Sequence, residues 1–129
     1  MADATYPDDL RYHEEHDWVR IEADLGVFGI TWYAQDSLGE VVFFEPPEVG
    51  SEIKQGAAYA EVESVKAVSD VIAPMSGEVV EVNGALEDAP ERINEDPYGE
   101  GWLVKVRLSA PREAEGLMGA ADYRKLVES

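Results

Sequence analysis

The chain has 129 residues, of which 45% are apolar, and its 28 acidic and 10 basic side chains give a formal net charge of −18. This length predicts a single domain over residues 1–129 with a true hydrophobic core. The charge excludes a nucleic-acid or anionic-membrane surface, since either needs a basic face. Because cysteine is absent, disulfides, thiolate metal sites and cysteine nucleophiles are also excluded.

The apolar residues are spread along the chain, and no run of 18 or more could span a membrane. The first ten residues lack the basic start and the apolar stretch of a signal peptide, and they are acidic, unlike a transit peptide. We therefore expect a cytoplasmic protein of bacterial type. The surplus of negative charge suits partners with basic patches, although simple solubility explains it equally well.

In chain order, β-branched and aromatic residues recur in short segments bounded by turn residues. These segments predict strands over residues 18–23, 26–30, 40–45, 58–63, 77–83 and 101–108. In residues 58–63, alternation places Ala58, Ala60 and Val62 on one face and Glu61 and Glu63 on the other. The pattern indicates a mainly β protein, either a sandwich or a barrel.

Helical segments are short by comparison. Residues 31–39 have Thr31 as a candidate N-cap and Gly39 as a stop, and residues 87–96 can hold a turn or two. Residues 109–129 are the best helical segment, with a proline near the start and basic residues near the end. Gly116 and Gly119 are expected to divide this segment into two pieces.

Lys66 is the single basic residue between positions 55 and 91, a stretch that holds eight carboxylates. A nucleophilic amine needs a lowered pKa, whereas Glu61, Glu63 and Asp70 would favour the ammonium form. Two readings remain from the residues alone. Lys66 is either an ordinary surface residue paired with a neighbouring acid, or an isolated amine on an exposed turn that a modifying enzyme can find.

A wider pattern favours modification. The stretch "ESVKA", with Gly77 eleven residues after the lysine, resembles the lipoyl-attachment hairpin, whereas biotinyl domains tend to flank their lysine with methionine. Four ordered blocks are similar to the H-protein family of the glycine cleavage system: "HDWVR", "GITWYAQDSLGEVVFFEPPEVG", "VESVKAVSDVIAPMSGEVVEVN" and "NEDPYGEGWLVKVRLS". The resemblance runs from about Leu10 to the C-terminus. Trp32 and Pro46 depart from the family pattern, and neither touches the lysine motif.

The resemblance implies a barrel-sandwich hybrid of two sheets, lipoyl-domain-like, with short helices and a C-terminal helix near 110–128. It also places Lys66 at a hairpin tip near 64–67, although "SVKA" contains none of the usual hairpin residues. By the same resemblance, Lys66 carries lipoate in amide linkage. The protein would then shuttle the aminomethyl group of glycine from glycine decarboxylase to aminomethyltransferase and be reoxidised by dihydrolipoyl dehydrogenase.

The family also implies roles for other residues. Glu63, Val65, Ala67 and Gly77 would serve recognition by the lipoate-attaching enzyme, with close strand packing as a further role for Gly77. His16, Asp17 and Asp70 would line a cleft for the loaded arm, where two carboxylates face its ammonium. The ordinary alternatives are a structural histidine, a turn or strand-end carboxylate and a solvated hairpin carboxylate. We expect a non-catalytic carrier that is monomeric when free.

Two other functions compete with the lipoyl carrier: a biotinyl carrier, and an unmodified interaction module of the same fold. An enzyme is the least supported. "HEEH" at 13–16 places its histidines three apart, which is not the H-E-x-x-H spacing of zinc proteases. We find no metal spacing, phosphate loop or Ser-His-Asp set in the sequence.

Overall fold

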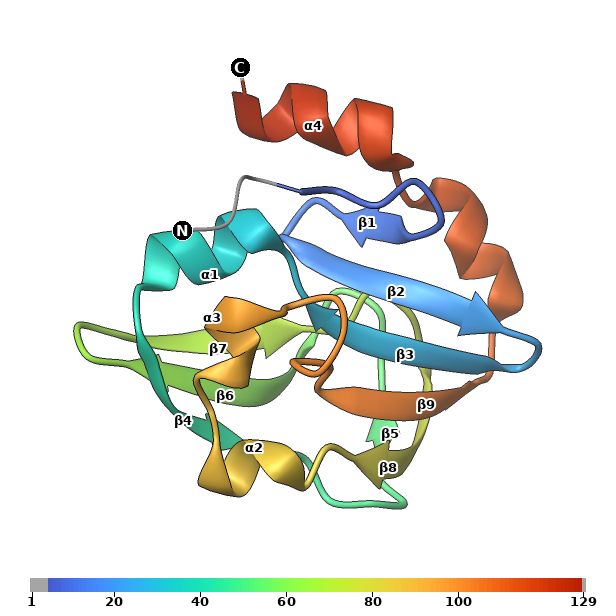
Figure 1. Ribbon diagram of the computed structural model, residues 1–129. Coiled ribbons are helices and arrows are strands. Elements are labelled where there is room, and N and C mark those ends of the chain that lie inside the picture. The colour runs from blue at the N-terminus through green and yellow to red at the C-terminus, as the bar shows by residue number, and fades with distance from the viewer. Residues whose placement is uncertain (1–4, 129) are drawn as a thin grey trace.

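The computed structural model describes residues 5–128, and its strands form two antiparallel sheets (Figure 1). The six-stranded sheet has the order β1-β2-β3-β9-β8-β5, and the three-stranded sheet has the order β4-β6-β7. The strands are β1 (Arg11–His13), β2 (Asp17–Glu22), β3 (Leu25–Ile30), β4 (Val41–Glu45), β5 (Glu52–Ile53), β6 (Ala58–Ser64), β7 (Val68–Ile72), β8 (Gly77–Val82) and β9 (Val104–Leu108).

The main core draws apolar side chains from both sheets. Val19 and Phe28 come from β2 and β3, and Val62 and Val71 come from β6 and β7; all four are buried. Alternation puts these side chains on the inner faces and leaves polar side chains outside. The expected barrel-sandwich of two sheets, with short helices and a C-terminal helix, is confirmed.

The helices are short, as the sequence predicts: α1 (Trp32–Leu38), α2 (Ala85–Asp88), α3 (Arg92–Glu95), the 3₁₀ helix η1 (Pro111–Gly116) and α4 (Ala120–Glu128). Thr31 is the N-cap of α1, and its Oγ1 accepts a hydrogen bond of 3.2 Å from the Ala34 N–H. Gly39 ends α1 at a φ of +84°, a left-handed conformation that glycine adopts without strain. The C-terminal segment is divided in two, as expected.

A second core lies where α4 covers β1 (Figure 1). Tyr12 of β1 stacks on Tyr123 of α4 with ring centroids 4.8 Å apart, and Tyr6 meets both rings edge-on. Trp18 of β2 is fully buried in the same cluster. The C-terminal helix is thereby tied to the strand that leads into residues 16–18.

The structure corrects two expectations about strands. The strands predicted by residue pattern do not include β1, β5 and β7. β1 and β5 are very short, and β7 is a five-residue segment whose two central polar residues, Ser69 and Asp70, interrupt its apolar ones. Ala58 is exposed while Tyr59 and Ala60 are both buried, because the register of β6 and β7 shifts between Ala58 and Ala60. Within residues 5–128, no helix has the length and apolarity needed to cross a membrane.

Candidate functional site

Lys66 lies in the connection between β6 and β7, which projects from the body of the protein beside α1 (Figure 1). The side chain is exposed, and it takes part in no ion pair among residues 5–128. Val65 beside it is 68% exposed. The tip therefore presents one amine to solvent, next to an exposed apolar side chain.

Ser64 builds the turn at this tip. Its backbone N–H donates to the Ala67 carbonyl at 2.8 Å, and its Oγ accepts hydrogen bonds from the Lys66 and Ala67 N–H groups at 3.3 and 3.1 Å. A serine hydroxyl that bonds nearby backbone groups replaces the glycine or asparagine of an ordinary hairpin turn. Sequence reasoning missed Ser64, although a serine at the end of a strand is a usable signal for this kind of turn.

Asn94 of α3 holds the segment between α1 and β4, which contacts the tip. Its Oδ1 accepts from the Val41 N–H at 2.8 Å, and its Nδ2 donates to the Gly39 carbonyl at 2.8 Å and to Gln35 Oε1 at 3.0 Å. The Glu40 carbonyl, held between these bonded residues, accepts from the Val65 N–H at 3.0 Å. Asn94 thus fixes the segment on which the tip rests, and no local sequence signal predicts this role.

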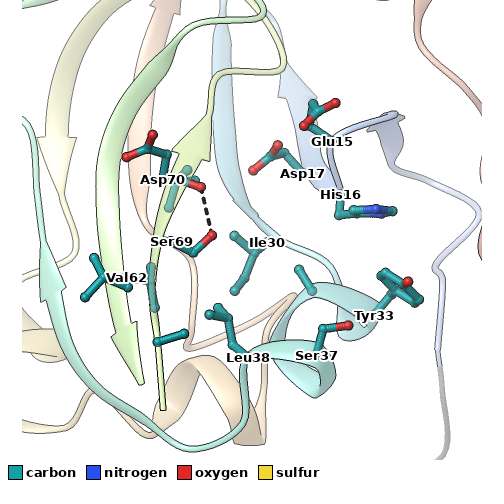
Figure 2. A pocket seen from close by; sticks show the side chains of 14 residues that line it. Glu15, His16, Asp17, Ile30, Tyr33, Ser37, Leu38, Val62, Ser69 and Asp70 are labelled. Carbon is teal, nitrogen blue, oxygen red and sulfur yellow. Dashed lines mark hydrogen bonds between the residues drawn. The ribbon is translucent and has the colours of Figure 1, made fainter. Parts of the chain in front are cut away.

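A cleft of about 340 Å³ starts at the tip and runs between β7, α1 and the turn before β2 (Figure 2). Ala67 and Val68 border it next to Lys66, and Ile30, Leu38 and Val62 supply apolar walls. The predicted cleft residues His16, Asp17 and Asp70 all lie along this same cleft. An arm attached to Lys66 would have an apolar channel ending in polar groups.

Asp17 is the most unusual residue of the cleft. It begins β2 opposite Ile30 and is 2% exposed, yet its Oδ2 has no hydrogen-bond partner among residues 5–128. Burial raises its pKa well above the usual range, and the nearby charge of Glu15 raises it further, while a hydrogen bond from the Ile72 backbone opposes the shift. In Figure 2 the carboxylate points across the cleft toward β7.

Tyr59 has the second buried hydroxyl or carboxyl oxygen without a partner within residues 5–128. Burial raises the pKa of this phenol, and the negative charge of Asp17 raises it as well. The ring packs edge-on against Phe28 in the main core. Sequence reasoning did not anticipate this buried phenol.

His16 has a structural role in the cleft wall. Its Nδ1 lies 2.8 Å from the Tyr123 hydroxyl, its ring packs on Tyr33 at 4.5 Å, and burial lowers its pKa. The Thr31 N–H donates to its carbonyl at 3.1 Å, which joins the residue to the start of α1. Its ring is directed away from Asp17 in Figure 2. These contacts favour the structural alternative for this histidine.

Asp70 does not face Asp17 directly. It borders the cleft from β7, but its side chain is exposed and points away from the Asp17 carboxylate in Figure 2. The Ser69 hydroxyl donates to the Asp70 backbone carbonyl at 3.3 Å. The expected pair of converging carboxylates is thus replaced by one buried carboxyl group and one at the rim.

The four residues expected to serve recognition are split between two places. Glu63, Val65 and Ala67 lie at or beside the tip and are exposed. Gly77 is buried in the other sheet, where an added Cβ would approach the Arg107 carbonyl to 2.2 Å. Close packing of β8 on β9 accounts for this glycine.

Within residues 5–128, no three histidine, cysteine, aspartate or glutamate side chains are grouped so as to hold a metal ion. His16 is engaged by aromatic neighbours, and the amine of Lys66 is solvated. What the geometry offers is an exposed amine next to a channel that ends at a buried carboxyl group.

The family model described as Glycine cleavage H-protein matches residues 10–129. The chain belongs to the glycine cleavage H-protein family. Similar proteins named glycine cleavage system H protein come from Symbiobacterium thermophilum, at 58% identity over 93% of this chain and 94% of that one, and from Carboxydothermus hydrogenoformans, at 50% identity over 95% and 94%. The resemblance stated from the four sequence blocks is therefore confirmed.

Solved structures agree with this family. The crystal structure of a glycine cleavage system H protein from Mycobacterium marinum matches with a TM-score of 0.87 and 41% identity, covering 95% of this chain and 99% of that one. Coverage is nearly complete on both sides, so the likeness extends to the whole fold. Membership in this family disfavours the biotinyl carrier and the unmodified module.

Proposed function

We propose that this protein is a lipoylated carrier of the glycine cleavage system, with lipoate attached to Lys66. The observation that carries the proposal is the position of an exposed amine at the mouth of a cleft whose inner end holds the buried, unpaired Oδ2 of Asp17. The family supports the same role.

Lipoate fits these residues. Lys66 is free to form an amide, and the apolar side chains of Ile30, Leu38 and Val62 suit the hydrocarbon part of the arm. When attached, lipoate supplies a disulfide on a long tether that takes up the aminomethyl group of glycine and later releases it. The chain has no cysteine that could compete by thiol–disulfide exchange.

The residues of the chain then have distinct tasks. Ser64 and Asn94 hold the tip in one geometry, so that the arm always leaves from the same point. Asp17 binds the cationic amino group of a loaded arm, and a cation nearby lowers its raised pKa and favours the carboxylate. Apolar walls exclude water from this end of the arm. Asp70 at the rim adds negative charge to the entrance.

The proposal assigns no chemical step to the protein itself. Its partners are glycine decarboxylase, aminomethyltransferase, dihydrolipoyl dehydrogenase and the lipoate-attaching enzyme, all in the cytoplasm. Glu63, Val65 and Ala67 surround the amine that the attaching enzyme must reach. The tether raises the effective concentration of the arm at each docked active site.

Lys66→Arg tests the carrier role. Arginine keeps the positive charge on an exposed side chain, so folding should be unchanged, but a guanidinium cannot accept lipoate. We expect intact mass to increase by one lipoyl group in the natively expressed wild type and to stay unchanged in the variant. Reconstituted glycine decarboxylation should fall to background with the variant as carrier. Lys54→Arg is the matched control, and activity near wild type in Lys66→Arg would refute the assignment.

A further inference from the structure

The outward side chains of the three-stranded sheet form two rows in register. Phe43, Glu63 and Val68 lie opposite one another across β4, β6 and β7, and so do Glu45, Glu61 and Asp70. All six are exposed, and we refer to them as the outer face. Since residues directly opposite on antiparallel strands share a face of the sheet, three carboxylates stand side by side.

This row is unfavourable for the isolated protein. Carboxylates directly opposite on neighbouring strands have Cβ atoms roughly 5 Å apart and repel one another. None of the ion pairs among residues 5–128 involves Glu45, Glu61 or Asp70. The chain thus maintains an uncompensated like-charge row on this sheet.

The other sheet provides an internal contrast. Its outward carboxylates Glu78 and Glu81 on β8 face Arg107 and Lys105 on β9 in register, and both form ion pairs, at 3.5 and 3.7 Å. Cations are therefore present where β8 and β9 face solvent and missing from the outer face. The missing cations are what a partner protein can supply.

The outer face also exposes apolar side chains. Phe43 is 49% exposed and Val68 is 60% exposed, and they flank Glu63 in the row nearer the tip. Phe43 also borders an apolar groove of about 310 Å³ with Phe44 and Pro46. An acidic row beside exposed apolar side chains has the composition of a docking surface for a basic partner with an apolar centre.

We propose that the outer face docks the enzyme that loads the arm, through two or more basic side chains and an apolar side chain of that enzyme. The inference rests on the proposed carrier function. Glu61 lies about 10 Å along β6 from the turn at Ser64, within reach of an arm on Lys66. The Asp17 carboxylate is buried inside the cleft, and of the outer face only Val68 and Asp70 border that cleft. An enzyme on the outer face therefore covers one rim of the cleft and leaves the side formed by α1 open to the loaded arm.

The double variant Glu45→Gln/Glu61→Gln tests the inference, with Glu22→Gln/Glu52→Gln as the control. Both change the formal charge by the same amount at exposed strand positions. At low ionic strength we expect the first to raise the KM of glycine decarboxylase for lipoylated carrier about three- to tenfold, since individual exposed pairs contribute little. Its kcat, and the KM of aminomethyltransferase, should stay the same. Phe43→Ala should likewise raise the KM of the decarboxylase and leave the KM of the aminomethyltransferase unchanged.

The free energy of unfolding distinguishes a lost docking contact from a destabilised fold. Removing like-charge repulsion should leave the free energy of unfolding of the Glu45→Gln/Glu61→Gln variant equal to or above that of the wild type. An unchanged decarboxylase KM, an equal rise in the control, or a rise confined to the transferase would overturn the proposal. If lipoylated wild type itself gave no saturable decarboxylase activity, the carrier function would fail, and this inference with it.

Discussion

Asp17 is a carboxyl group in surroundings that disfavour its charge. Burial is the main cause of its raised pKa, and the neighbouring charge of Glu15 acts in the same direction. The protonation of Asp17 therefore depends on what binds beside it. A cation in the cleft offsets the desolvation of the carboxylate, whereas an uncharged arm does not.

The raised pKa predicts how stability depends on pH. Below the ordinary value of 3.8, Asp17 is protonated in both the folded and the unfolded protein and has no effect. Above 3.8 the unfolded chain releases the proton first, so stability is lost with rising pH until the folded group also ionises. Each pH unit in this window removes at most about 1.4 kcal/mol.

Asp17→Asn should remove this loss. We expect the free energy of unfolding of the variant, minus that of the wild type, to increase as pH rises from 4 and then to become constant above the folded pKa. Urea denaturation at several pH values measures it. Asp24→Asn, which removes an exposed carboxylate at a turn, is the control for the loss of one negative charge. A decreasing difference would contradict the raised pKa.

The same substitution should shorten the life of the loaded protein. A charge-assisted hydrogen bond contributes about 1.5 to 3 kcal/mol and a neutral one about 1, so an amide holds a cationic arm less firmly. We expect lipoylation and decarboxylation to continue while the loaded form releases formaldehyde roughly three- to thirtyfold faster, as 1.4 kcal/mol is a factor of ten. Release is timed without transferase. Asp70→Asn, at the rim, should have a smaller effect, and equal rates in all three proteins would rule out the carboxylate clamp.

At the scale of elements, α4 determines the shape of the cleft wall. The Tyr123 hydroxyl lies 2.8 Å from His16 Nδ1 and 2.8 Å from Thr31 Oγ1, so one side chain joins the turn before β2 to the N-cap of α1. Both joined residues lead directly into cleft-lining segments. The C-terminal helix is thus part of the site, although it does not border the cleft.

Tyr123→Phe should loosen this wall. The ring and its stacking on Tyr12 are kept, while the hydrogen bonds to His16 and Thr31 are lost, at a cost of about 1 to 3 kcal/mol. Urea denaturation measures the loss, and hydrogen exchange should become faster at the Thr31 and His16 amides. Tyr33→Phe keeps the ring that packs on the same histidine and removes only its hydroxyl, so it should have almost no effect. Equal losses in the two variants would contradict the role of Tyr123.

The elements that sequence predicts well are those with a strong local signal. Thr31 and Gly39 bound α1 because capping is decided by the residues themselves, and β2, β3, β8 and β9 have long apolar patterns. β7 is short, mixes apolar and polar residues without a clear alternation, and becomes a strand through pairing with β6. The Lys66 tip was found from the family pattern alone, because its turn depends on a serine hydroxyl.

In the candidate site, too, residues with a local sequence signal could be predicted and residues without one could not. Asp17 and Lys66 could be selected from motifs, since their residue types and order match the family. The support from Asn94 and Tyr123 could not, because hydrogen bonds over 53 to 107 positions in the chain leave no local pattern. Asp70 points outward because alternate residues of β7 lie on opposite faces of the sheet. Its distance in sequence from Lys66 does not reveal on which face it lies.

For the whole molecule, the surplus of negative charge predicts two effects of salt with opposite signs. The chain has 28 acidic and 10 basic residues, and Arg92, Lys105 and Arg107 already pair with acids of the described residues. Repulsion among the remaining carboxylates destabilises the folded state, and the same charges attract basic partners. Both interactions act between exposed groups and are screened beyond about 8 Å at physiological ionic strength.

We therefore expect added sodium chloride to raise the free energy of unfolding while it slows association with glycine decarboxylase. Urea, which is uncharged, denatures the protein at each salt concentration between 10 and 300 mM, and stopped-flow mixing gives the association rate under the same conditions. Most of the change in rate should appear in association rather than dissociation, because steering acts before contact. An association rate independent of salt would remove electrostatic steering, even if stability rose as expected. Stability independent of salt would instead contradict the repulsion among the exposed carboxylates, including the row of Glu45, Glu61 and Asp70.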